Sequence, residues 1–187
     1  MKATLKKLIL YALLIGVIYI FYTAWRNGIS SDRLLKWFII LLGGLVILLI
    51  AIRIWVNDYR KQQYLSSPLS AIDRMTGKEF EEYLQAHFEE RGYTVNLTPD
   101  SHDYGADLVC EKADEILIIQ AKRYDGKVGN AAIQEIVAAK AYYDATECMV
   151  ITNSYFSKPA IELAERNGVE LWDRDCLNSN FGAILSN

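Results

Sequence analysis

Two polar residues stand at the end of a segment that otherwise reads as a buried β-strand. Residues 116–122 alternate between two faces, so Ile118, Gln120 and Lys122 share one of them. Apolar residues on both faces indicate a central strand, in which an amide followed by a lysine is unusual. A lysine that simply leaves the core at the end of the strand is the plainer interpretation. The alternative is that the amide and the ammonium serve a chemical purpose.

An acidic residue is expected to lie opposite that pair. Asp107 begins a second predicted strand, 107–111, and a polar turn around Ala113 and Asp114 joins the two strands as a hairpin. In such a hairpin Asp107 lies across from Gln120 and Lys122. A carboxylate, an amide oxygen and an ammonium then converge, which is the composition of a site for a hard cation beside a fixed positive charge.

A fourth candidate comes from the helix that precedes these strands. Thr76 and Glu79 have the spacing of a capping box, which predicts that a helix begins here and ends before Gly92. Its buried stripe consists of Phe80, Tyr83, Leu84, His87 and Phe88. Glu79 is explained by the cap and Glu82 is expected to face solvent. Glu81 lies at the margin of the stripe, where it could reach an adjoining site, although an exposed acid is the plainer interpretation.

The remaining elements predict an α/β fold. After a strand at 93–97 and the hairpin, the sequence indicates a helix at 130–144, a strand at 148–152, a helix at 158–167 that ends at Gly168, and a strand at 169–172. This order predicts a mixed sheet flanked by helices, with a βαβαβ second half.

The charge is divided unevenly along the 187 residues. Residues 1–56 hold seven Lys and Arg against one acid, whereas residues 57–187 hold 13 basic and 22 acidic residues. The first part is therefore strongly basic and the second strongly acidic. A hydrophobic content of 52% excludes a disordered chain, and three widely spaced cysteines exclude a disulfide scaffold.

The basic first part reads as a transmembrane helical hairpin. Residues 8–25 and 37–52 contain no charged side chain, and each segment approaches the length that spans a bilayer. We predict helices at about 6–25 and 34–56, joined by a short turn. A cleaved signal peptide and a buried core helix are the alternatives. The positive charges favour both termini inside, hence a multi-pass protein of the inner or cell membrane whose second part faces the cytoplasm.

The domain boundaries follow from these features. We predict a polar juxtamembrane linker at 57–71, a folded domain at 72–178 and a C-terminal tail at 179–187.

Six ordered segments of that domain resemble the Mrr-type restriction endonucleases, within the PD-(D/E)xK nuclease superfamily. They are MTGKEFE at 75–81, RGYTV at 91–95, DYGADLV at 103–109, IQAKRY at 119–124, VGNAAIQE at 128–135 and VITNSYFS at 150–157. The resemblance covers roughly residues 72–178 and does not include the predicted membrane hairpin.

The resemblance implies a restriction-endonuclease-like fold, Mg²⁺ as cofactor and DNA as substrate. Asp107 matches the metal-binding aspartate, Gln120 a position held by Glu or Gln, and Lys122 the catalytic lysine. Glu81 matches an acidic site position, which implies metal ligation by Asp107, Gln120 and Glu81. Gln134 matches a helix position near the site.

The sequence therefore predicts a membrane-anchored, Mg²⁺-dependent DNA endonuclease acting on foreign or modified DNA, with DNA and the lipid bilayer as partners and a homodimer as a candidate assembly. The residues expected to contact DNA are Lys78, Arg123, Lys127, Gln134 and Lys158. The acidic balance of the domain favours one rival, a non-catalytic, membrane-tethered nucleic-acid-binding module that keeps the nuclease fold. A membrane interaction protein with no nucleic-acid role is the third alternative.

Overall fold

The computed structural model describes residues 30–99 and 104–181, and in addition Gly16, Val17, Tyr19, Tyr22–Ala24 and Arg26. The chain divides into two compact units, Met1–Asn57 and Asp58–Asn187, each of which is described by itself.

The first unit is dominated by the apolar part of helix α2, Ser31–Leu65. The segment Leu35–Leu65 has a hydropathy of 2.8 in its most apolar window, none of which is buried in the structure. By length and composition it is a candidate membrane span, as predicted for 34–56. The predicted partner helix at 6–25 lies largely outside the described residues. Those of its residues that are described are helical.

Helix α2 does not end at residue 56, where the sequence predicted a polar linker. It continues to Leu65, and a short helix α3, Leu69–Ile72, follows Pro68. Two contacts within the second unit account for the extra turns. Lys61 pairs with Glu89 at 2.9 Å, and the hydroxyl of Tyr64 donates to Glu82 at 2.9 Å.

The second unit is built on a five-stranded mixed sheet in the order β1-β2-β3-β4-β5. The strands are β1 Thr94–Leu97, β2 Leu108–Lys112, β3 Glu115–Lys122, β4 Glu147–Thr152 and β5 Glu170–Trp172. The first three pair antiparallel and the last three pair parallel, so β3 joins the two patterns. The predicted mixed α/β architecture is confirmed.

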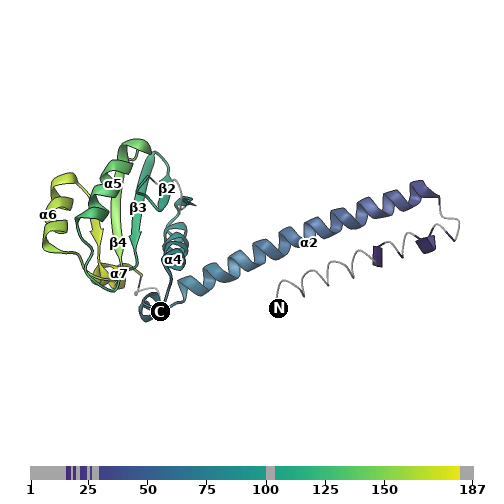
Figure 1. Cartoon of the computed structure of the whole chain (residues 1–187), viewed down its shortest axis with the longest axis horizontal. Helices are drawn as coiled ribbons and strands as arrows, with labels where there is room; N and C mark the ends of the chain where they lie inside the picture. The colour runs from purple at the N-terminus through teal and green to yellow at the C-terminus, as the bar shows by residue number, and fades with distance from the viewer. Residues whose placement is uncertain are drawn as a thin grey trace. The chain divides into compact units, whose positions relative to one another are not determined.

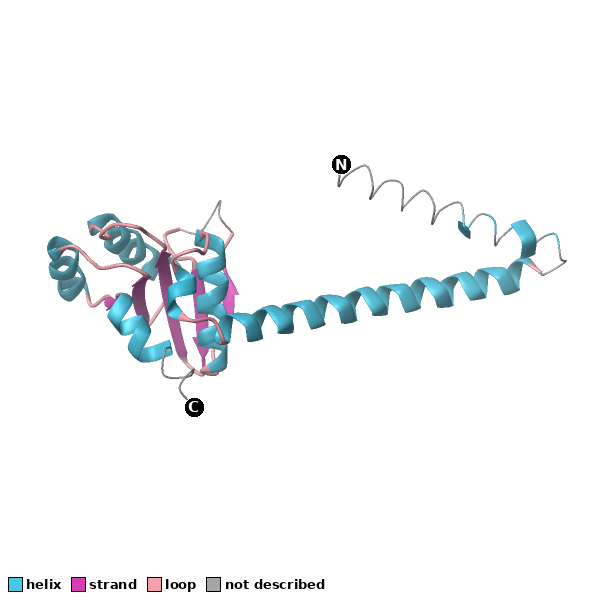
Figure 2. Cartoon of the chain, turned by 90° about the horizontal axis from the view of Figure 1, so that it is seen from below, coloured by secondary structure: helices cyan, strands magenta, loops and turns pink. Residues whose placement is uncertain are grey.

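Helices cover both faces of the sheet (Figures 1 and 2). Helix α4, Gly77–Glu90, packs on the face that carries Leu117 and Ile119. Helices α5, Asn130–Tyr142, and α6, Lys158–Asn167, cover the opposite face, which carries Ile118. Because Gln120 and Lys122 alternate with these residues along β3, they belong to the face that carries Ile118.

Local signals set the bounds of the helices. The predicted capping box is present at α4, where Thr76 accepts from the Glu79 amide and the Glu79 carboxylate accepts from the Thr76 amide. Helix α6 begins at the cap residue Ser157 and ends at Gly168, whose φ of 64° is the left-handed conformation that glycine adopts readily.

A further helix, α7, Arg174–Phe181, was not predicted. The segment is polar, and only its buried residues Leu177 and Phe181 are large and apolar. The ring of Phe181 packs on His87 and Trp172, with Arg91 over its face at 4.5 Å. The folded domain therefore extends into the segment that the sequence assigned to a tail from residue 179.

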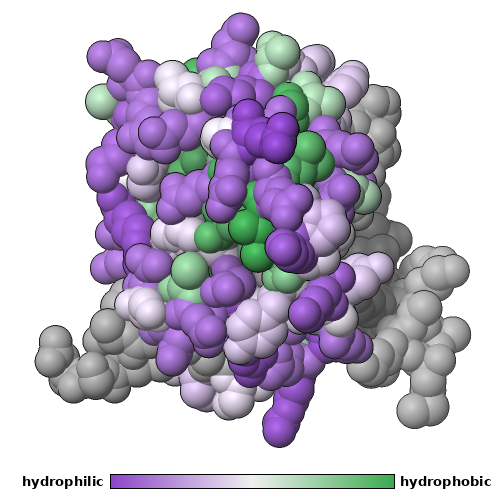
Figure 3. All heavy atoms as spheres, turned by 90° about the vertical axis from the view of Figure 1, so that its left-hand side faces the viewer, coloured by the Kyte–Doolittle hydropathy of each residue, from purple (hydrophilic) through white to green (hydrophobic). Residues whose placement is uncertain are grey.

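The face of the domain seen in Figure 3 is largely hydrophilic, with a small group of hydrophobic side chains near its centre. Ile161 of α6 is a large apolar residue that stays exposed. Isolated residues of this kind are normal on a soluble surface.

Candidate functional site

Asp107 and Gln120 meet at the ends of two neighbouring strands. The register of β2 and β3 sets Leu108 opposite Ile119, so the next pair along is Asp107 and Gln120. The side-chain amide nitrogen of Gln120 lies 2.5 Å from Oδ2 of Asp107. The same oxygen accepts from the backbone amide of Ala121 at 2.7 Å. The convergence of these two side chains was predicted from the hairpin and the strand period.

The backbone on both sides holds the Asp107 carboxylate in place. The Asp107 amide donates to Ile119 at 2.9 Å, and its carbonyl accepts from Thr98 at 3.0 Å. The Thr98 hydroxyl also donates to the carbonyl of Ala106 at 2.7 Å. The aspartate is therefore positioned by strand pairing, which fixes a ligand better than a free loop does.

The amide oxygen of Gln120 is the most informative atom of the site. Gln120 is 3% exposed, and among the residues that the structure describes its Oε1 has no hydrogen-bond partner. A buried acceptor without a donor is costly, and such an atom often marks the position of an ion. A carboxylate and an amide oxygen are ligands that Mg²⁺ accepts, so these residues fit a magnesium ion.

Lys122 follows on the same face of β3 and contacts a residue that the sequence analysis did not select. Its ammonium lies 2.9 Å from the carboxylate of Glu135 on α5. Glu135 is the only acidic residue in 130–142, directly after the selected Gln134. The signal that could have identified it is its position, since it is the only acidic residue of the helix that follows the strand of Lys122.

Glu135 also contacts the segment that carries Asp107. Gly105 has a φ of 96°, and a β-carbon at this position would meet the carbonyl carbon of Glu135 at 2.8 Å. The chain can pass this close to α5 only because residue 105 has no side chain.

Glu81 comes from the other layer of the domain. It lies on α4, which packs on the sheet face opposite Gln120, and it is half-buried. The expectation that Glu82 faces solvent is wrong, because Glu82 is half-buried and accepts from Tyr64. The cause is the extension of α2, whose last turns reach this side of α4.

The residues expected to contact DNA do not form one cluster along the chain. Lys78 and Lys158 stand in the first turns of α4 and α6, Lys127 precedes α5, and Gln134 lies on α5. All four are exposed. Arg123 differs from them. Its guanidinium donates to the backbone carbonyl of Asp73 and pairs with Asp125 at 3.0 Å, so it is already engaged within the domain.

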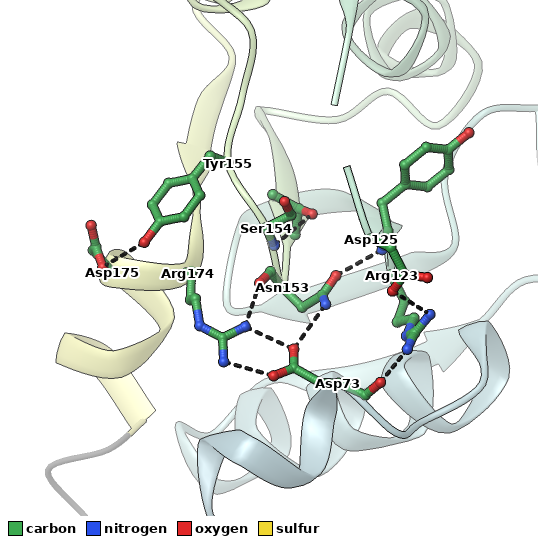
Figure 4. A network of polar contacts seen from close by, with 10 residues as sticks. Asp73, Arg123, Asp125, Asn153, Ser154, Tyr155, Arg174 and Asp175 are labelled. Carbon is green, nitrogen blue, oxygen red and sulfur yellow. Dashed lines mark hydrogen bonds and ion pairs between the residues drawn. The ribbon is translucent and has the colours of Figure 1, made fainter. Parts of the chain in front are cut away.

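Arg123 belongs to a polar network beside the site, the Asp73 clamp, which consists of Asp73, Arg123, Asn153 and Arg174 (Figure 4). Two nitrogens of Arg174 donate to the two oxygens of Asp73, each at 2.7 Å. Asn153 donates to Asp73 at 3.1 Å. Because these residues follow α3, β3, β4 and β5 respectively, the clamp ties together four segments of the domain.

The clamp also fixes the backbone that leaves the site. The side-chain oxygen of Asn153 accepts from the amide of Tyr124 at 2.7 Å, two residues after Lys122. The hydrogen bonds from Arg174 lower the pKa of Asp73 to about 2, so its carboxylate is charged at every physiological pH. No local sequence pattern points to this network, because its members lie far apart in the chain.

Three solved structures are similar to parts of the chain. A protein of unknown function, AF1548, is 19% identical with a TM-score of 0.46, over 55% of this chain and 60% of that one. EndoMS in its apo form is 15% identical with a TM-score of 0.37, over 50% and 45%. MspJI restriction endonuclease in complex with a 27-mer oligonucleotide is 17% identical with a TM-score of 0.39, over 72% and 30%.

The chain thus spans less than two thirds of each of these proteins. No curated protein matches it.

The family model Mrr_cat, described as a restriction endonuclease, matches residues 72–180, which is more than half of the chain. The match includes Asp107, Gln120, Lys122 and Glu135, and the chain therefore belongs to the Mrr-type restriction endonuclease family.

Proposed function

We propose that this protein is a Mg²⁺-dependent DNA endonuclease anchored to a membrane. The observation that carries the proposal is the meeting of Asp107 with Gln120 on one face of the sheet, with an unpartnered amide oxygen among the described residues and Lys122 next along the strand. Hydrolysis of a phosphodiester requires a nucleophilic water and the neutralisation of charge that develops on the phosphate oxygens. A carboxylate, an amide oxygen and a lysine are suited to both tasks.

Each side chain has a defined role in this proposal. Asp107 and Gln120 hold the cation, which when bound supplies charge neutralisation and activation of water. Gln120 adds no charge, so the site needs a second carboxylate. The family resemblance assigns that role to Glu81 of α4, although α4 packs on the opposite face of the sheet. Lys122 presents a compact ammonium to the phosphate, where it stabilises the charge that builds up as the P–O bond to the leaving oxygen breaks.

The decisive test compares Lys122→Ala and Asp107→Asn with the wild type in a supercoiled-plasmid nicking assay, with Mg²⁺ and with EDTA. We expect the wild type to nick only with Mg²⁺, and each variant to be slower by about 10²–10³-fold. The double variant should be little slower than either single one, because residues that act as a unit are not additive.

Melting curves for the same variants separate catalysis from folding. Lys122 is 29% exposed, so its truncation should change the free energy of unfolding by only about 0.5 kcal/mol. Lys140→Ala, on α5, is the matched control and should nick like the wild type. Nicking by the Lys122 variant at the wild-type rate would reject the nuclease assignment.

A second candidate function is DNA binding without cleavage. It is favoured by the neutral side chain of Gln120, which gives a cation at this site one carboxylate fewer than a glutamate would. A gel shift in the absence of nicking, with or without Mg²⁺, would support this second function over the first.

The membrane anchor is part of the proposal, with two spans at about 6–25 and 34–56 and the nuclease domain in the cytoplasm. It rests on the apolar length of Leu35–Leu65 and on the distribution of Lys and Arg in the sequence. A reporter enzyme that is active only outside the cytoplasm, fused after residue 187, should be silent. An active reporter would overturn this orientation and with it a cytoplasmic DNA substrate.

A further inference from the structure

We infer that Glu135 is a positioning residue for the cleavage reaction, and that it acts by holding the ammonium of Lys122 at the site. The inference rests on the proposed nuclease function and assigns a role to a side chain that was not among the candidate site residues. Two independent contacts carry it: the ion pair with Lys122 and the close packing of Gly105 on the Glu135 peptide.

The ion pair restricts a side chain that is otherwise flexible. A lysine side chain has four rotatable bonds, so without a partner its ammonium samples many positions. The 2.9 Å contact with Glu135 selects the conformers in which the ammonium stays near α5, on the sheet face of Gln120. The ammonium has three donors, and a single carboxylate oxygen occupies one of them, which leaves donors for a phosphate oxygen or a water.

Stability does not account for this pair. The side chains of Lys122 and Glu135 are 29% and 46% exposed, and ion pairs this open to water contribute little to the free energy of unfolding. An acid beside a phosphate site is also unfavourable for binding DNA, an anion. The Lys122–Glu135 contact therefore adds little stability, and the negative charge of Glu135 repels DNA. Such a contact is explained if it orients Lys122.

The second contact fixes the Glu135 backbone relative to the proposed metal ligand. The peptide of Glu135 lies against Gly105, and Gly105 is two residues before Asp107. Ala106 and Asp107, which follow Gly105, are in turn held by the Thr98 side chain and by strand pairing to Ile119. One residue of α5 therefore meets both halves of the site, with its backbone toward the Asp107 segment and its carboxylate on Lys122.

The test uses Glu135→Gln in the full-length protein, with Glu162→Gln on α6 as the control that removes the same charge from an exposed helix position. We expect the Glu135 variant to lower the kcat for plasmid nicking by about 10- to 100-fold. The KM for plasmid and the Mg²⁺ concentration at half-maximal rate should stay within twofold of wild type, since Glu135 binds neither. Glu135→Asp, which keeps the charge, should recover a large part of the rate.

A readout without DNA or metal accompanies the kinetics. The rate at which an acylating reagent modifies Lys122, followed by mass spectrometry of each lysine, should rise severalfold in Glu135→Gln and stay unchanged in Glu162→Gln. Lys140, on the same helix as Glu135, serves as the internal reference.

Each alternative outcome has a distinct meaning. If Glu135→Gln needed more Mg²⁺ for half-maximal nicking, Glu135 would be a metal ligand. If its melting temperature fell so far that unfolding accounted for the lost rate, Glu135 would be structural. Either result overturns the inference, as does an unchanged kcat. If the wild-type protein does not nick, the proposed function itself is refuted. If the wild type nicks and Glu135→Gln is equally active, only the role of Glu135 is refuted.

Discussion

The amide of Gln120 donates to the carboxylate of Asp107 across 2.5 Å, so the two residues are held together by a proton that an ionised carboxylate at position 120 could not supply. A glutamate at the same position has no such proton. Position 120 therefore has different requirements with and without a cation.

Gln120→Glu should be destabilised when metal is absent and rescued when it is present. Two carboxylates this close repel each other, so the melting temperature in EDTA should fall below that of the wild type. Mg²⁺ should then raise it by more than it raises the wild type, because the variant offers one more charged ligand. Asn178→Asp adds the same charge at an exposed position of α7 and should show neither effect. A Gln120 variant with no response to Mg²⁺ would argue against a metal at this position.

Glu81→Gln should weaken the apparent affinity for Mg²⁺. If Glu81 supplies the second carboxylate, its loss should raise the Mg²⁺ concentration at half-maximal nicking by about 10-fold or more. Glu90→Gln, at the exposed end of the same helix, is the control, because Glu82 is engaged with Tyr64. Equal Mg²⁺ titrations for the Glu81 and Glu90 variants would remove Glu81 from the site.

Gly105→Ala should destabilise the domain, since both the φ of 96° and the nearby Glu135 peptide exclude a β-carbon. We expect a loss of at least about 2 kcal/mol in the free energy of unfolding, measured by urea denaturation. Gly126→Ala is the control, because a β-carbon there meets nothing within 4 Å, and it should stay within about 0.5 kcal/mol. Equal stability of the two variants would contradict the close approach of residue 105 to α5.

Asp73→Asn should weaken the Asp73 clamp. The substitution removes the charge that pairs with both nitrogens of Arg174, and we expect a loss of about 1–2 kcal/mol in urea denaturation. Asp125→Asn removes the other carboxylate that contacts Arg123, but Asp125 is 86% exposed, so its effect should stay below about 0.5 kcal/mol. If Asp125→Asn cost as much as Asp73→Asn, the bidentate pair would not be the stabilising element.

His87 should make the domain sensitive to mild acid. Burial lowers the pKa of His87 to about 4, since its ring is enclosed by Tyr83 and Phe181. The unfolded chain binds the proton near pH 6.5, so stability is full above pH 6.5 and falls by roughly 3 kcal/mol as the pH drops to 4. The lowered pKa of Asp73 reduces the free energy of unfolding only below about pH 3.8. The pH ranges in which His87 and Asp73 affect stability therefore do not overlap.

His87→Phe should flatten the pH dependence of unfolding between pH 6.5 and 4. The ring of His87 stacks on Phe181 and packs against Tyr83, so a phenyl ring should fit at small cost. Urea denaturation at half-unit pH intervals checks this. A variant whose stability falls as steeply as that of the wild type would show that another group titrates in this range.

The sequence was sufficient for the parts of the site that lie on one hairpin. The period of a strand assigns Gln120 and Lys122 to one face, and a single turn fixes the register that brings Asp107 to Gln120. Glu135 was missed because its neighbour depends on how a helix from the following crossover sits on the sheet. The helix is seated on the sheet by the packing of Ile133 and Ile136. The helical period identifies these two residues as buried, but it does not tell which strand residues they contact.

The same reasoning explains the errors elsewhere. Glu82 was expected in solvent because the sequence pattern of α4 alone cannot reveal that Tyr64, from helix α2, covers it. Helix α7 was missed because a polar segment with two buried residues carries almost no periodic signal. Asp73 and Arg174, which are 101 positions apart, could be paired only by the finished fold.

That separation has a consequence for the order in which the protein is made. Asp107, Gln120, Lys122 and Glu135 all emerge from the ribosome within 29 positions of one another, and their contacts are short-range, so they can form while synthesis continues. Arg174 emerges much later, and only then can it close on Asp73. Asp107, Gln120, Lys122 and Glu135 can therefore meet in a nascent chain before Arg174 is available to close on Asp73.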